Sequence, residues 1–434
     1  MFGRAAAVLL TVCLAVIVAS CGDDEGGLPS PTDEGTPAET PRSDLGAAEA
    51  VVIFASPDGT AQALGRVLQA GAPAKFFLGG SSRDEASFRG VSLPGEAIAK
   101  GVSLTAIGSE AFDAAYEARF GTSPADFAGV REAYDAVYLI ALAAAAANST
   151  DGAAVRDNVH YVANSPGEIV NPGGEAFSAA VQALTEGGDV NYIGVSGQVD
   201  FTDDGDLAKG RVTVWRLLGE QVVDLEIRDV DLAAEVGAVI PAGELSAVAG
   251  TPDGPLRIGA VLPLQTVSGR AVGDAMQMAV DEINDAGGLF GAPIEVLIDG
   301  AADASQTAAA VRNIEDQGVS AIVGPPGEGA LAVAEAVRGL HIALTSSPLL
   351  ALAVGGPVFR GAMSESLEAP PLANVALEDE ATVVCVIFEP GARNKALANV
   401  FRDIFELKGG GVRLVMELSG DEAAGGAISA CLGT

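Results

Sequence analysis

Residues 256–288 read LRIGAVLPLQTVSGRAVGDAMQMAVDEINDAGG, and they contain the clearest strand and helix signals of the chain. Residues 257–262 form a short apolar run that predicts a buried strand, and residues 272–286 repeat apolar side chains at the helical period. Gly287 and Gly288 end this helix. A buried strand followed by such a helix is the unit from which parallel sheets are built.

The same alternation runs through most of the chain. It predicts strands at 51–54, 76–78, 257–262, 294–298 and 321–323, and helices at 60–70, 134–147, 272–286, 304–317 and 330–338. Apolar strands separated by helices of this length indicate parallel sheets with helices on both faces. We therefore expect an α/β fold with doubly wound lobes, whose ligands bind at the carboxyl ends of the strands.

Length and net charge bound the number of domains and exclude some classes of binding partner. The 434 residues suffice for two or three domains, and the formal charge of −34 excludes electrostatic attraction to nucleic acid or to anionic lipid. Two histidines and 5% aromatic residues disfavour a histidine-rich metal centre. The sequence predicts no metal and no cofactor.

The first 21 residues predict a secretory signal peptide. Arg4 precedes an apolar run at residues 5–19, too short to span a bilayer comfortably. The run ends in Val18-Ala19-Ser20-Cys21, which resembles the lipobox of bacterial lipoproteins and implies lipidation of Cys21. The alternative is an ordinary cleavage site beside an incidental cysteine. Residues 22–44 are rich in Gly, Pro, Ser, Thr, Asp and Glu and predict a disordered tether. We expect an extracytoplasmic protein, in the periplasm or on the outer cell surface, that meets the membrane through its lipid anchor alone.

Two cysteines remain beyond the lipobox. Cys385 and Cys431 could form a disulfide outside the cytoplasm, or they could be two buried free thiols. The sequence leaves both alternatives open.

Several motifs resemble one family. Residues 257–264 (RIGAVLPL), 279–288 (AVDEINDAGG) and 319–325 (VSAIVGP) are similar to the first half of the Leu/Ile/Val-binding family of ABC-transporter solute-binding proteins. Residues 134–138 (YDAVY) and 197–201 (GQVDF) are similar to that family's later parts. The two halves occur in swapped order, so the resemblance implies a circularly permuted type I periplasmic-binding-protein fold. A rearranged gene product without a working cleft and a domain-swapped dimer are the alternatives.

The resemblance also implies the domain boundaries. Residues 45–235 correspond to the family's C-terminal half, residues 236–255 to a Pro/Gly-rich linker, and residues 256–434 to its N-terminal half. Within these halves, lobe one comprises 109–190 and 256–377, and lobe two comprises 45–108, 195–225 and 380–434.

In this family two lobes close on the ligand, so the resemblance implies binding loops at the strand ends. In lobe one these are the loop at Gly327 and Glu328, and the turn at Thr345, Ser346 and Ser347. In lobe two they are Ser56 and Asp58, Gly80 and Ser81, and Arg393.

Several of these positions depart from the family pattern: residues 56–58 stand where the family has an aromatic residue, and the turn at 345–349 keeps its hydroxyls but loses a threonine. Glu328 stands about where the family has a serine, and Arg393 stands in place of a tyrosine. One hypothesis is a reversed polarity, in which Arg393 binds an anion and Glu328 an amine. The alternatives are a solvated helix-start carboxylate, an exposed arginine and, at 345–347, a turn whose hydroxyls satisfy their own backbone.

No motif predicts catalysis. The stretch Gly194–Gln198 (GVSGQ) lacks the final glycine of a nucleophile elbow. The sequence therefore predicts a binding protein that captures a small polar ligand, an amino acid or an amide-like compound, and delivers it to an ABC permease. The alternative is an extracytoplasmic sensor built on the same fold.

Overall fold

The structure is a computed structural model that describes residues 41–71, 74–245, 252, 254–352, 358–418 and 423–433. The predicted signal peptide, Cys21 and most of the predicted tether lie outside the described residues, as does part of the predicted linker. No helix within the described part of the chain combines the length and the apolar character needed to cross a membrane.

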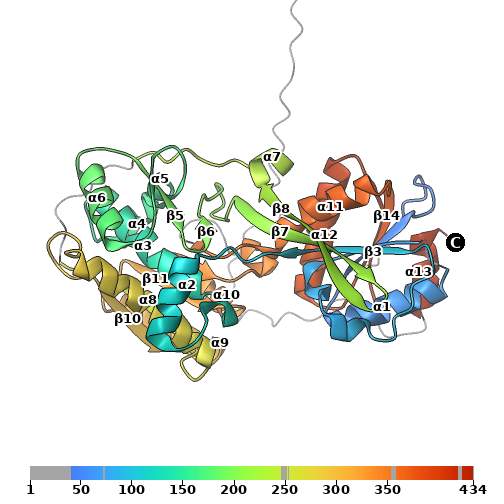
Figure 1. Ribbon diagram of the computed structural model, residues 1–434, viewed down its shortest axis with the longest axis horizontal. Helices are drawn as coiled ribbons and strands as arrows, with labels where there is room; N and C mark the ends of the chain where they lie inside the picture. The colour runs from blue at the N-terminus through green and yellow to red at the C-terminus, as the bar shows by residue number, and fades with distance from the viewer. Residues whose placement is uncertain are drawn as a thin grey trace, which may run out of the picture. The chain divides into compact units, whose positions relative to one another are not determined.

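A seven-stranded sheet combines strands from both ends of the chain (Figure 1). Its order is β15-β14-β1-β2-β3-β7-β8, and the first five strands are parallel. The strands are β1 (Ala50–Phe54), β2 (Lys75–Leu78), β3 (Ile98–Leu104), β7 (Lys209–Leu218), β8 (Gln221–Asp231), β14 (Val383–Phe388) and β15 (Gly411–Glu417). The five parallel strands follow the 2-1-3-4-5 order of doubly wound sheets, with the end of the chain supplying positions 1 and 2.

A five-stranded parallel sheet has the same order within one continuous stretch of chain. Its order is β10-β9-β11-β12-β13. The strands are β9 (Arg257–Leu262), β10 (Glu295–Gly300), β11 (Ala321–Pro326), β12 (Leu340–Leu344) and β13 (Val358–Arg360). A small third sheet contains β4 (Glu168–Val170), β5 (Val190–Gly194) and β6 (Gly197–Gln198). The expected α/β fold with parallel sheets is thus confirmed.

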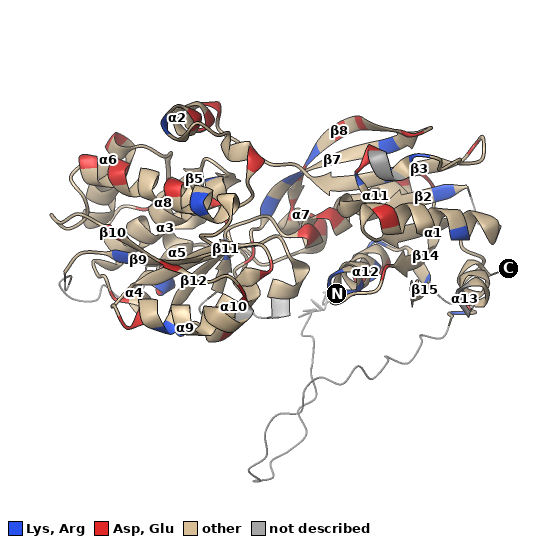
Figure 2. Ribbon diagram, turned by 90° about the horizontal axis from the view of Figure 1, so that it is seen from below, with Lys and Arg blue, Asp and Glu red and all other residues tan. Residues whose placement is uncertain are grey.

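Helices cover both faces of the two larger sheets. The α-helices are α1 (Pro57–Gln69), α2 (Glu110–Phe120), α3 (Val130–Ala147), α4 (Gly152–Asp157), α5 (Val159–Ala163), α6 (Gly174–Thr185), α7 (Leu232–Val236), α8 (Val267–Asp285), α9 (Ala304–Glu315), α10 (Gly329–Ala336), α11 (Ala369–Glu378), α12 (Ala392–Leu407) and α13 (Ala423–Leu432). On the seven-stranded sheet, α11 and α12 pack on one face, and α1 and α13 on the other. On the five-stranded sheet, α3 and α8 lie opposite α9 and α10. Acidic positions are spread over elements around both sheets, with fewer basic ones among them (Figure 2).

The helix boundaries show where periodicity alone misjudges a helix. The predicted helix at 272–286 begins earlier, at Val267, because the Thr266 hydroxyl accepts a hydrogen bond from the Gly269 amide (2.9 Å) and caps the first turn. The helix predicted at 134–147 begins at Val130 and ends as expected, with Asn148 in the left-handed conformation (φ 46°).

One helix differs from the predicted lobe boundary. All but the last residue of α11 (Ala369–Glu378) falls within the range 256–377 expected for lobe one. Their buried side chains, including Leu372 and Val375, instead belong to the core of the seven-stranded sheet. The crossing into the core of the seven-stranded sheet therefore comes before α11, because the apolar face of this helix packs against β2, β3 and β8.

The first and last described segments meet beside the seven-stranded sheet. The Ala48 amide donates to the Leu432 carbonyl (3.0 Å), and the Arg42 amide donates to the Arg413 carbonyl (2.9 Å). Nearby, a disulfide joins Cys385 on β14 to Cys431 on α13, with a Cα–Cα distance of 5.6 Å. The structure thus favours the disulfide over two free thiols.

Candidate functional site

Glu365 is hydrogen-bonded to two of the predicted site residues, and a third joins them through Arg393. The Ser346 hydroxyl donates to Glu365 Oε1 (3.1 Å), and Arg393 Nε donates to Glu365 Oε2 (2.7 Å). Arg393 Nη2 also donates to the Ser81 hydroxyl (3.1 Å). We call Glu328, Glu365, Glu368, Ser81, Ser346 and Arg393 the Glu365 cluster.

The cluster lies at the carboxyl ends of strands from both larger sheets. Ser346 follows β12, Ser81 lies in the short 3-10 helix η1 (Gly80–Ser82) after β2, and Arg393 lies in the first turn of α12 after β14. Glu365 begins another 3-10 helix, η5 (Glu365–Glu368), which leads into α11. Carboxyl ends of parallel strands are where doubly wound sheets bind ligands.

Glu368 is the buried carboxyl group of the cluster. Its Oε2 accepts a hydrogen bond from the Gly80 amide (2.8 Å), and its Oε1 accepts one from the Leu104 amide (3.0 Å). Gly80 leaves room for this carboxylate, because a Cβ at this position would lie 2.0 Å from Glu368 Oε1 and would force the side chain to shift. Burial raises the pKa of Glu368 to about 8, although these two hydrogen bonds act in the opposite direction.

Arg393 is half-buried rather than freely exposed. Burial lowers its pKa, but the hydrogen bond to Glu365 and the charges of Glu365, Glu368 and Glu328 outweigh this, so its pKa is raised. Glu328 itself is exposed at the start of α10 and follows Gly327, whose φ is 74°. Its position is that of a helix-start carboxylate that lies within electrostatic range of Arg393.

The three hydroxyls at 345–347 do not play one role. Thr345 and Ser347 are buried, and their oxygens accept hydrogen bonds from the amides of Ser347 and Leu349 within the turn (3.1 and 3.4 Å). Ser346 differs, because its hydroxyl points to Glu365. The self-satisfying turn therefore describes Thr345 and Ser347.

A buried arginine, Arg360, donates hydrogen bonds to the backbone of this turn. Arg360 has no exposed surface; its Nε donates to Asp206 (2.6 Å), and its Nη1 donates to the carbonyl oxygens of Thr345 and Ser347. The sequence analysis did not single out Arg360 as a site residue. The feature that could have indicated it is a charged residue at the end of the short apolar run Val358-Phe359-Arg360.

Ser56 and Asp58 occupy the start of α1. The Ser56 hydroxyl caps the helix by accepting from the Gly59 amide (3.1 Å), and the Ser56 amide donates to Glu389 (2.6 Å). Asp58 is exposed in the first turn. The described hydrogen bonds of Ser56 thus connect it to Gly59 and Glu389 at the start of α1.

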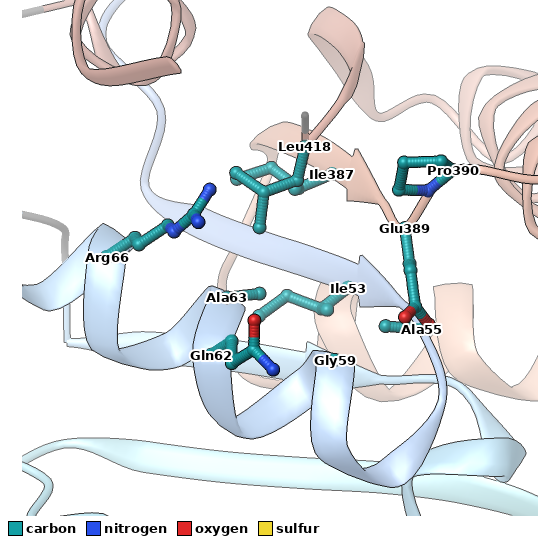
Figure 3. Close-up of a pocket in the computed structure, with 10 residues that line it drawn as sticks. All are labelled: Ile53, Ala55, Gly59, Gln62, Ala63, Arg66, Ile387, Glu389, Pro390 and Leu418. Carbon is teal, nitrogen blue, oxygen red and sulfur yellow. The ribbon is translucent and has the colours of Figure 1, made fainter. Parts of the chain in front are cut away.

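A separate pocket of about 180 Å³ lies beside α1, at the ends of β1 and β14 (Figure 3). It is lined by Ile53, Ala55, Gly59, Gln62, Ala63, Arg66, Ile387, Glu389, Pro390 and Leu418. None of these ten was among the predicted site residues. Glu389 sits against Gly59, where a Cβ would lie 2.7 Å from its carboxylate carbon. Among the residues that the structure describes, no group of three or more His, Cys, Asp or Glu could hold a metal ion.

Two family models match the chain in separate segments. Residues 255–421 match the family described as periplasmic binding protein. Residues 43–220 match the family described as receptor family ligand binding region. No curated protein matches the chain.

Solved structures similar to the chain align with part of it. A Rhodospirillum rubrum protein provisionally named a branched-chain amino acid ABC transporter is 26% identical, with a TM-score of 0.32, over 38% of this chain and 51% of that one. An ABC transporter substrate-binding protein from Desulfitobacterium hafniense, solved in complex with Leu, is 21% identical, with a TM-score of 0.32, over 39% and 52%. A solute-binding protein from Rhodopseudomonas palustris BisB5, in complex with 3,4-dihydroxybenzoic acid, is 16% identical, with a TM-score of 0.30, over 38% and 47%. The chain thus spans about half the length of these structures. Residues 255–421 thus match the periplasmic binding proteins, residues 43–220 match a ligand-binding region of receptors, and both larger sheets have the doubly wound order of the type I fold.

Proposed function

We propose that the chain captures a small polar solute, such as an amino acid or an amide-like compound, and delivers it to an ABC permease. The observation that supports this most is the Glu365 cluster, in which Ser346 from the end of β12 and Arg393 from the start of α12 share one carboxylate. The proposed mechanism is binding with lobe closure, and it requires no chemical step and no cofactor.

The proposal includes a circularly permuted chain with the two lobes given above, lobe one now ending before α11. Both parallel sheets have the order 2-1-3-4-5, but in one of them positions 1 and 2 come from β14 and β15 and positions 3 to 5 from β1 to β3. The contact between Ala48 and Leu432 is where an unpermuted chain would continue from α13 toward β1. Permutation is tolerated where new ends lie at a surface junction.

The proposed location is extracytoplasmic, with the lipid on Cys21 as the membrane anchor and residues 22–44 as the tether. The disulfide between Cys385 and Cys431 supports an oxidising compartment. Two or more acyl chains suffice for stable anchoring.

A thermal-shift screen against amino acids, amides, urea-like compounds and short carboxylates tests the capture function. A bound solute raises the unfolding temperature by mass action, and 100 times the Kd in free ligand adds about 2.7 kcal/mol. For the solute that gives the largest shift, Ser346→Ala and Arg393→Ala should each raise the Kd at least tenfold. Arg338→Ala removes an exposed arginine that pairs with Glu315 and should leave the response unchanged. A folded protein that responds to no solute would instead favour a rearranged gene product without a working cleft.

A sensor on the same fold is the second candidate. The match of residues 43–220 to a receptor-family ligand-binding region favours it. Permease and ATPase genes beside this gene would support transport, and a receptor kinase gene would support sensing.

A further inference from the structure

The charge balance of the Glu365 cluster favours one class of solute. Hydrogen bonds and charge interactions connect the Arg393 guanidinium to three carboxyl groups, those of Glu365, Glu368 and Glu328. Glu368 is buried, both of its oxygens already accept backbone amides, and its pKa of about 8 keeps it largely protonated at pH 7. Glu365 and Glu328 then face one cation, which leaves the cluster with one excess negative charge.

Arg393 is also poorly placed to receive a carboxylate from a solute. Its Nε donates to Glu365 and its Nη2 to Ser81, so these donors are in use. A solute carboxylate that took the remaining N–H groups of Arg393 would lie beside Glu365 and within the field of Glu328. It would add a second excess negative charge to a half-buried site, and like charges close together disfavour binding.

Glu365, by contrast, retains acceptor capacity. A carboxylate has about four lone-pair sites. Glu365 uses one oxygen for the Ser346 hydroxyl and the other for Arg393 Nε. An ammonium group could donate to the remaining sites without breaking either bond, and Glu328 would add a second negative charge from the start of α10.

We propose that the solute bound at this site carries a net positive charge, on an ammonium or guanidinium group, and that Glu365 is the residue that recognises it with help from Glu328. This inference rests on the proposed capture function and names the solute class for that same site. It replaces the reversed-polarity hypothesis in one respect, because Arg393 here holds Glu365 in place and does not bind a solute anion.

The test compares head groups on matched skeletons with the full-length protein. Each skeleton, aliphatic or aromatic with two to eight carbons, is titrated as an amine, a neutral amide and a carboxylate by calorimetry at pH 7. For the skeleton that binds most tightly, we expect the amine to have a Kd at least tenfold below that of the carboxylate. Glu365→Gln should weaken the amine at least tenfold and narrow or reverse the preference. Glu328→Gln, at an exposed position where folding is not at risk, should weaken the amine two- to fivefold.

The matched control is Glu378→Gln, which removes a carboxylate that pairs with Arg228 outside the cluster and should not change any Kd. Tighter binding of carboxylates than of amines would overturn the inference and leave the capture function standing. An amine preference that survives both Glu365→Gln and Glu328→Gln would overturn the assignment of these residues. Absence of binding by every compound to the folded protein would overturn the capture function and this inference together.

Discussion

The disulfide between β14 and α13 makes a quantitative prediction about stability. It joins Cys385 to Cys431 across a separation of 46 residues. For a loop of this length, the disulfide lowers the conformational entropy of the unfolded state by about 13.5 cal/mol/K, which destabilises that state by about 4 kcal/mol at 25 °C. We therefore expect reduction to lower the free energy of unfolding by about 4 kcal/mol. If the lobe unfolds as a unit of about 150–250 residues, this corresponds to a fall in Tm of roughly 8–16 °C.

The assay compares urea unfolding of the oxidised and the reduced protein. The reduced sample is first unfolded in the reductant, so that the buried sulfurs become accessible, and is then refolded in its presence. The double variant Cys385→Ala/Cys431→Ala is the control, because its unfolding curve should not respond to reductant. A non-reducing peptide map should contain one linked pair of peptides. A difference below about 1 kcal/mol between the oxidised and reduced proteins, or a map with both cysteines free, would refute the reasoning.

Three further predictions concern buried groups. Glu368→Gln should remove a pH dependence of stability, because the folded state keeps the Glu368 proton up to about pH 8 while the unfolded state loses it near pH 4.5. Relative to the variant, the free energy of unfolding of the wild type should therefore fall by roughly 2 kcal/mol between pH 6 and pH 8. Urea unfolding across this pH range measures the difference. Equal pH slopes for the two proteins would contradict this. Asp135→Asn should lower the free energy of unfolding by about 2–4 kcal/mol. The buried carboxylate accepts four hydrogen bonds, from the Tyr192 hydroxyl, the Val195 amide, the Ser196 amide and the Ser196 hydroxyl. The side-chain amide of asparagine cannot accept all four. Asp151→Asn, at an exposed helix cap where asparagine serves as well, is its control and should change stability by a few tenths of a kcal/mol. Gly101→Ala should cost about 1–3 kcal/mol, because the new Cβ would lie 2.1 Å from the buried Trp215 ring, whereas Gly65→Ala on α1, with nothing within 4 Å, should be neutral or stabilising in the same thermal melts.

The parallel sheets could be predicted because their strands are continuous apolar runs. The predicted strand at residues 257–262 coincides with β9, and the run at 51–54 lies within β1. The start of α8 could not be read from periodicity, since residues 267–271 carry little of the apolar pattern and the cap at Thr266 sets the boundary. Membership of α11 in one core or the other depends on which strands its apolar face meets, and this is a tertiary property that its sequence does not record.

The candidate site shows a sharper limit of the same kind. The hydroxyls of Thr345, Ser346 and Ser347 look alike in sequence, yet the backbone of the turn uses two of them and leaves Ser346 for Glu365. A turn motif predicts that hydroxyls will be present, but not that Arg360, on the neighbouring strand β13, donates to two carbonyls of the turn. Glu365 itself carries no motif. Its role arises because side chains after β12 and β14 bond to it and Ser81, after β2, joins through Arg393. Strands β2 and β14 belong to one sheet that joins the first part of the chain to the last. A charge that recognises a solute can therefore sit at a position that no local pattern marks, and in this protein the order of strands, more than any motif, determines which side chains meet.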